Sequence, residues 1–228
     1  MTPLGWLGIV RLGLVQASLG AVVVLTTSTL NRVMVVELAL PALLPGLLVV
    51  LHHMLQMLRP RMGYGSDVGG RRTPWIVGGM AVLATGGFLA AVAVAWMGSD
   101  RTAGIALAVL AFALIGVGVS AAGTSLLVLL AKRVDEARRA PAATVVWVMM
   151  IVGFAVTAGV AGRWLDPYSP ERLLAVSGGV SAVAMLVTLL ALAGVEGRGP
   201  ASTPAPVAAR ERTDFRTALA QVWAEPAA

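Results

Sequence analysis

Long apolar runs separated by short polar segments make up the chain as far as residue 195. A helix needs about 20 residues to cross the roughly 30 Å hydrocarbon layer of a membrane. Several runs reach this length, and they are residues 75–97, 104–130, 142–161 and 173–195. The pattern therefore predicts an all-α integral membrane protein.

The start of the chain is expected to supply two more spans, which brings the total to six transmembrane helices. The first begins near Leu12, and we interpret it as an uncleaved signal anchor because no clear small-residue cleavage site follows Arg11. The second begins at Pro41, since proline is favoured in the first turn of a helix, and it ends within residues 58–62. Residues 31–37 lie between them, either as an external loop or as the outer end of a long first helix.

The last part of the chain differs in composition from the rest. Residues 197–209 are rich in Gly, Pro, Ala and Ser, which is typical of a flexible linker. Residues 210–223 can form a short amphipathic helix on the membrane surface. We therefore divide the chain into a transmembrane domain, residues 1–196, and a cytoplasmic tail, residues 197–228.

The amino-acid composition supports a membrane protein and excludes one alternative. Of 228 residues, 58% are hydrophobic and 12% are charged, whereas a soluble domain has about 25% charged residues. The net charge of +6 arises from short basic clusters between apolar runs, with no basic face that carries aromatic side chains. Nucleic-acid binding is therefore excluded as a function.

The basic residues indicate the orientation of the chain, because cytoplasmic loops collect Lys and Arg. Of the 17 basic residues, thirteen fall in segments that lie on one side of a six-helix arrangement. They are Arg11, Arg59, Arg61, Arg71, Arg72, Lys132, Arg133, Arg138, Arg139, Arg198, Arg210, Arg212 and Arg216. The opposite side holds Arg32, Arg101, Arg163 and Arg172. The N-terminus and the tail are thus expected in the cytoplasm of a bacterial cell, with the helices in its inner membrane.

The loop before residue 75 carries a motif made of Gly63, Asp67, Gly70, Arg71 and Arg72. Glycine allows close helix approach and tight turns, and the two arginines can bind acidic groups or lipid headgroups. The motif resembles the signature loop of the major facilitator superfamily, where it implies a conformational latch. The alternative interpretation is an ordinary basic cytoplasmic turn.

The same resemblance implies a fold. It implies the N-terminal half of a twelve-helix protein, built from two inverted three-helix repeats. The C-terminal half would then be missing from this chain, either because the chain is a fragment or because a partner supplies it.

Residues 30–38 and 59–76 narrow the resemblance further, to the PucC family of phototrophic bacteria and to its branch labelled a bacteriochlorophyll synthase subunit. The resemblance implies a non-enzymatic protein that handles bacteriochlorophyll, or a precursor of it, as bound cargo. It also implies a role in assembling light-harvesting complexes, with light-harvesting polypeptides or pigment-synthesis enzymes as partners besides membrane lipid.

Other branches of the superfamily fit less well. Phe112 stands where proton-coupled drug exporters carry an arginine, and residues 142–161 lack the Gly-Pro pair of those exporters. Gly153, Gly159 and Gly162 are instead expected to allow close helix packing. No acidic residue lies near the middle of a span, which disfavours a proton carrier and also an acid–base pair for catalysis. Transport of a small apolar or amphipathic solute stays open as a second function.

Two adjacent histidines, His52 and His53, lie near the middle of the second predicted span. A neutral imidazole is a suitable axial ligand for the magnesium of a chlorophyll and is tolerated in hydrocarbon. Gln56 lies four residues after His52 on the same helical face, so it can hydrogen-bond that ring and favours His52 as the ligand. The alternative is a hydrogen bond that only packs two helices together. Gln16 and Ser18 in the first span are further candidates to line a cavity.

A polar group interrupts the first apolar stretch at Asn31, Arg32 and Glu37. Asn31 and Arg32 can bind the keto and ester oxygens of a pigment at the outer end of the helices, or Arg32 can simply extend to the membrane interface. A separation of five residues does not suit one face of an α-helix. The sequence therefore predicts that Arg32 and Glu37 find partners elsewhere.

The orientation generates a direct prediction. A reporter enzyme that is active only in the periplasm should be active when fused after Gly98 or Pro167, and inactive when fused after Gly69 or Arg138. Reporter activity in cells measures this, and the reverse pattern would contradict both the orientation and the superfamily resemblance.

Overall fold

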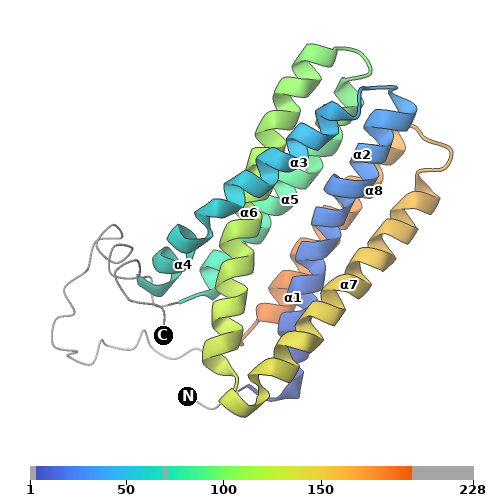
Figure 1. The fold of residues 1–228 in the computed structure, drawn as a ribbon. Helices are drawn as coiled ribbons and strands as arrows, with labels where there is room; N and C mark the ends of the chain where they lie inside the picture. Colours follow the sequence, from blue (N-terminus) through green and yellow to red (C-terminus); the bar gives the residue numbers. More distant parts are fainter. Residues whose placement is uncertain (1–3, 69–70, 197–228) are drawn as a thin grey trace. The chain divides into compact units, whose positions relative to one another are not determined.

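The computed structural model describes residues 4–68 and 71–196, and every regular element within them is a helix (Figure 1). These helices fall within one compact unit, Met1–Val195. Within the described residues, five helices are long and apolar enough to cross a membrane. They are the composite helix Trp6–Glu37, α5 (Thr73–Trp96), α6 (Arg101–Arg133), α7 (Arg139–Trp164) and α8 (Pro170–Leu192). The expected linker and amphipathic helix at 197–228 lie outside the described residues.

The first helix runs without interruption to Glu37, which decides between the two interpretations of residues 31–37 in favour of the long helix. It begins at Trp6, earlier than expected, and consists of four successive segments. They are α1 (Trp6–Val24), the π-helical turn η1 (Leu25–Thr29), α2 (Leu30–Arg32) and the π-helical turn η2 (Val33–Glu37). Ala39, with φ of 50°, then turns the chain toward the next helix.

The second predicted span is not one helix, and this corrects the expectation for residues 41–62. It consists of α3 (Leu43–Leu55), the 3-10 turn η3 (Gln56–Leu58) and α4 (Arg59–Val68). Pro60 explains the division, because proline has no N–H for the carbonyl of Gln56 and its ring clashes with that turn. Ser120 of α6 donates to the Leu55 carbonyl at 3.3 Å, so the end of α3 is tied to its neighbour.

Small residues bring α5 and α6 into close contact, and the two helices lie side by side (Figure 1). A Cβ added at Gly79 would lie 2.5 Å from the backbone nitrogen of Ala122, and one at Gly118 would lie 2.6 Å from that of Leu83. In α7, Gly153 approaches the Ala17 carbonyl of α1 in the same way, at 2.9 Å. A Cβ built on Gly159 or Gly162 meets no atom of the described residues within 4 Å, so within this chain the expectation of close packing is wrong for both.

The two ends of the bundle are anchored by different contacts. At one end, Arg11 donates from Nε to the Ala191 carbonyl at 2.9 Å and also reaches the Ala193 carbonyl, where a cation favours a helix C-terminus. The Leu4 amide donates to the Arg133 carbonyl at 2.7 Å at the same end. At the other end, Asp100 caps α6 and Ser169 caps α8. Arg11 and Arg133 therefore share one end, as their assignment to one side of the membrane requires.

The close contact of α5 with α6 predicts a strong position dependence of glycine substitutions. Gly118→Leu should lower stability by about 1–3 kcal/mol or more, because its side chain would collide with the backbone of α5. Gly159→Leu is the matched control and should behave like the parent chain. Thermal unfolding in mild detergent measures the difference, and equal transitions for the two variants would contradict the packing.

Candidate functional site

A pocket of about 290 Å³ lies where α1, α3, α6 and α7 meet, and it contains the two histidines. Apolar side chains and glycines make up most of its wall, and the polar groups lie on α1 and along the α3–α4 break. The lining residues are Gln16, Leu19, Gly20, Val23, His52, His53, Gln56, Arg59, Val119, Gly123, Leu127, Trp147, Met150 and Phe154. The structure thus brings together His52, His53 and Gln56 from the sequence prediction.

His52 is buried and takes part in a hydrogen-bonded chain of three side chains. Arg59 donates to Gln56 Oε1, so the amide oxygen of Gln56 faces the guanidinium group. The Gln56 amide nitrogen therefore points the other way, 2.8 Å from His52 Nε2. An amide N–H₂ can only donate, so Nε2 accepts and the proton of the neutral ring resides on Nδ1. In this arrangement neither ring nitrogen offers a free lone pair to a metal.

His53 carries its proton on the same ring nitrogen as His52, but the nitrogen that is hydrogen-bonded is the other one. Its Nδ1 lies 2.8 Å from the Val49 carbonyl, which can only accept, so Nδ1 carries the proton and Nε2 carries the lone pair. A backbone carbonyl that holds one ring nitrogen commonly orients a histidine that ligates a metal through the other. The ring is exposed at the pocket and meets His52 edge-on, with centroids 4.7 Å apart. The geometry therefore favours His53 as an axial ligand, whereas the sequence favoured His52.

Two lining residues were not predicted as part of a histidine site. Arg59 entered the sequence analysis only through its charge, although its position three residues after Gln56 is a signal for a helical contact. Gln16 comes from α1 and donates to Met150 Sδ at 3.2 Å, while its Oε1 is buried without a partner among the described residues. Gln16 therefore presents an unused acceptor beside the pocket.

Asn31, Arg32 and Glu37 do not line this pocket. Asn31 donates to the Thr27 carbonyl of its own helix at 2.7 Å. Arg32 pairs with Glu37 at 3.6 Å, which corrects the expectation that each finds a partner elsewhere. The reason is the π-helical turn η2, whose hydrogen bonds join residues five apart and so bring this pair to one face.

Tyr168, in the connection between α7 and α8, interacts electrostatically with Glu37 of this group. Burial raises the pKa of the Tyr168 hydroxyl, and the charges of Glu37 and Glu171 raise it further. The phenol is therefore neutral at ordinary pH. Tyr168 and Glu37 thus belong to one electrostatic group at the end of the first helix.

The structure describes only part of the expected latch. Gly63 lies in α4 against α6, and a Cβ built on it would lie 3.3 Å from Thr124 Cγ2, as its predicted role in close approach requires. Arg71 is exposed, and Arg72 precedes the first turn of α5. Gly70 lies outside the described residues, and Asp67 is described only as part of the α4 backbone.

Comparison with known proteins identifies the family. A family model described as PUCC protein matches residues 29–228. The chain belongs to the PUCC family. The resemblance expected from residues 30–38 and 59–76 is thereby confirmed. No solved structure matches the chain.

The PUCC relatives are longer than this chain. It is 55% identical over 225 residues to the Rhodobacter capsulatus protein named "Bacteriochlorophyll synthase 44.5 kDa chain", covering 99% of this chain and 52% of that protein. It is 34% identical over 206 residues to "Protein PucC" of Rhodovulum sulfidophilum, covering 83% of this chain and 44% of that protein. The chain therefore spans about half the length of the curated relatives it matches.

The hydrogen-bonded chain through Gln56 predicts a stability effect. Gln56→Leu should leave the buried Nε2 acceptor of His52 unsatisfied and cost about 1–3 kcal/mol. Met57→Leu, one residue further and exposed, is the matched control and should change stability little. Thermal unfolding of both variants in detergent provides the measurement, and a Gln56→Leu protein as stable as the control would show that the contact with His52 contributes nothing.

Proposed function

We propose that this chain is half of a bacteriochlorophyll-handling membrane protein, which binds the pigment or a precursor and assists the assembly of photosynthetic complexes. Membership of the PUCC family supports this, as does the similarity to a relative whose name includes bacteriochlorophyll. Light-harvesting polypeptides or pigment-synthesis enzymes would receive or supply the pigment.

The orientation of His53 is the observation that carries the proposal. A tetrapyrrole in a membrane protein needs an apolar site, one axial donor for its magnesium and a few donors or acceptors for its edge. His53 Nε2 offers the lone pair, and Val49 holds the ring through Nδ1 at 2.8 Å. Trp147 and Phe154 supply apolar surface in the same pocket, and Arg59 supplies a donor. His52 then acts as a positioning residue, fixed by Gln56.

The small volume of the pocket supports a site of which this half of the protein supplies one wall. A volume of about 290 Å³ lies at the lower limit of ligand pockets, which span about 300–1,000 Å³. The helices on either side are poorly covered. Their exposed apolar side chains are Leu43, Leu47, Val50 and Met54 on α3, and Trp147, Val148, Ile151, Val152, Val156, Val160 and Trp164 on α7. We assign this face to contact with the second half of the protein, which closes the pocket over the pigment.

The full architecture that we propose is the N-terminal half of a major facilitator fold. In it, α3, η3 and α4 together make a sixth crossing, bent at Pro60, and the helices form two inverted three-helix repeats. The basic end, with Arg11 and Arg133, faces the cytoplasm of the bacterial inner membrane. Gly63, Asp67, Gly70, Arg71 and Arg72 would act as the latch between conformations.

Enzymatic activity and solute transport are the competing functions. Among the described residues that line the pocket, the titratable groups are two histidines and one arginine, so no carboxylate is present for acid–base chemistry. One observation favours transport of a small amphipathic solute, and it is the unused Gln16 Oε1 acceptor. The keto and ester oxygens of a bacteriochlorophyll are themselves acceptors and do not use this atom, so we keep transport as the second candidate.

A pigment titration separates the two histidines. The chain would be co-expressed with the remaining part of the Rhodobacter capsulatus relative, purified in mild detergent and titrated with bacteriochlorophyll. His53→Leu should weaken binding by about tenfold or more, because it removes the axial donor, whereas His52→Leu should weaken it less. Met57→Leu, exposed and outside both the pocket and the assigned contact face, is the control.

Absorbance and fluorescence quenching report the bound pigment in this titration. Parental affinity in His53→Leu would remove that residue from the site. A larger loss of affinity in a folded His52→Leu protein than in His53→Leu would show that His52 is the axial ligand.

A further inference from the structure

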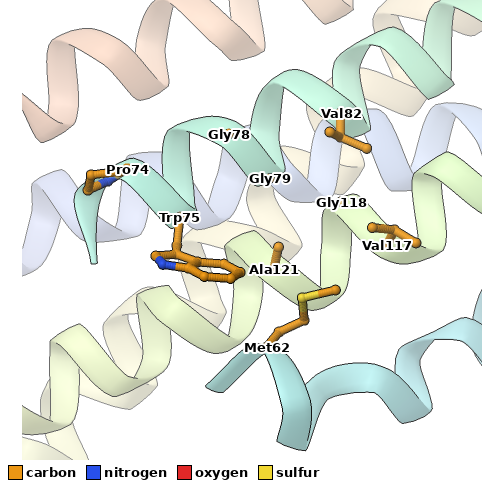
Figure 2. A pocket seen from close by; sticks show the side chains of 9 residues that line it. All are labelled: Met62, Pro74, Trp75, Gly78, Gly79, Val82, Val117, Gly118 and Ala121. Atoms are coloured by element: carbon orange, nitrogen blue, oxygen red, sulfur yellow. The ribbon is translucent and has the colours of Figure 1, made fainter. Parts of the chain in front are cut away.

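A second pocket, of about 400 Å³, lies between α4, α5 and α6 and shares no residue with the histidine pocket. Figure 2 shows Trp75 of α5 and Met62 of α4 on opposite sides of a floor formed by α6. The lining residues are Met62, Pro74, Trp75, Gly78, Gly79, Val82, Val117, Gly118 and Ala121. Every side chain among them is apolar apart from the indole N–H of Trp75.

Glycines create the pocket in two distinct ways. Gly79 and Gly118 are buried where the backbones of α5 and α6 meet, so they form a floor without side chains. Gly78 also lines the pocket and is exposed, and a Cβ built on it meets no atom of the described residues within 4 Å. A larger residue at position 78 therefore has room among the described residues, and glycine leaves this part of the pocket wall without a side chain.

The pocket is open to the surface of the bundle and lies at its basic end. Pro74 and Gly78 are exposed, while Trp75 and Met62 are half-buried. The residue after Trp75, Ile76, is buried in the cluster that contains Ile9, Leu130 and Val134, at the end where Leu4 bonds to Arg133. In a membrane, such an opening faces lipid chains near the headgroup layer.

Two exposed arginines stand close to lining residues in the sequence. Arg61 immediately precedes Met62 on α4, and Arg71 lies three residues before Pro74 at the entrance to α5. Within the described part of the chain, no ion pair engages either of them. An apolar groove between helices with basic residues at its membrane-facing rim is the arrangement that binds anionic lipids.

We propose that this pocket holds an acyl chain of an anionic phospholipid, whose phosphate is bound by Arg61 and Arg71. The apolar walls take up the chain, and Trp75 packs along it. The site is independent of pigment binding, since the two pockets have separate walls. Such a lipid would fasten α4 to α5 beside the latch residues.

Fluorescence quenching at Trp75 tests the proposal. The probe is the full chain with its other five tryptophans changed to phenylalanine, reconstituted in phosphatidylcholine vesicles. Phosphatidylglycerol or phosphatidylcholine with brominated acyl chains is then added, since bromine quenches tryptophan at short range. The brominated phosphatidylglycerol should bind near Trp75 about fivefold or more tightly than the phosphatidylcholine.

Two sets of variants test whether the preference for phosphatidylglycerol over phosphatidylcholine arises from the pocket. Gly78→Leu should fill the pocket and bring the ratio of the affinities for phosphatidylglycerol and phosphatidylcholine to about one. The double variant Arg61→Gln with Arg71→Gln should bring this selectivity to about one as well, because it removes the charges. Gly159→Leu, the matched control with equally open surroundings, should keep the parental selectivity. Equal quenching by the two lipids, or an unchanged selectivity in Gly78→Leu, would overturn the proposal. Quenching by added bacteriochlorophyll but by neither lipid would show that pigment occupies the pocket, and this result would also overturn the proposal.

A second measurement needs no tryptophan substitutions. Native mass spectrometry of the otherwise unaltered chain, titrated with phosphatidylglycerol in mild detergent, should show a retained lipid in the parent and in Gly159→Leu. Gly78→Leu should lose it. Retention by Gly78→Leu would contradict the proposed site even if the single-tryptophan chain failed to fold.

Discussion

The close backbone contacts of α6 determine where the other elements of the structure lie. Lipid chains are as apolar as leucine, so helices in a membrane associate through tight packing and hydrogen bonds. Gly118 brings α6 against α5, and Gly116 brings it against α3, where a built Cβ would lie 2.8 Å from the His52 carbonyl. The second contact turns His52 into the interior. Because adjacent helical residues point about 100° apart, His53 must face elsewhere, toward the pocket mouth.

The two histidines therefore differ in environment although they are neighbours in sequence. His52 is buried and committed to Gln56, whereas His53 is exposed and held only through Nδ1. Pro60 contributes to this difference, because the break that it causes places Gln56 in a 3-10 turn with Arg59 one helical turn away. One local break thus produces both the hydrogen-bonded chain and the polar side of an otherwise apolar pocket.

The sequence predicts the long helices well because a membrane requires about 20 apolar residues for each, and that signal is local. It does not reveal the π-helical turn that pairs Arg32 with Glu37, since a five-residue separation is unfavourable in a regular helix. The contact of Gln56 with His52 follows from spacing, but the tautomer depends on Arg59 as a third partner. Gly153 packs closely against another helix and Gly159 does not. This difference depends on the neighbouring helices, which no local sequence pattern identifies.

We propose that the pocket formed by α1, α3, α6 and α7 carries a pigment when the second half of the protein is present. The most direct test is the absorption spectrum of the protein after purification in mild detergent from a phototrophic host that supplies both halves. If the pocket binds pigment, near-infrared bands should co-purify with the protein in a fixed ratio. A colourless protein in every mild detergent that preserves its fold would rule out pigment binding and favour the transport of another solute.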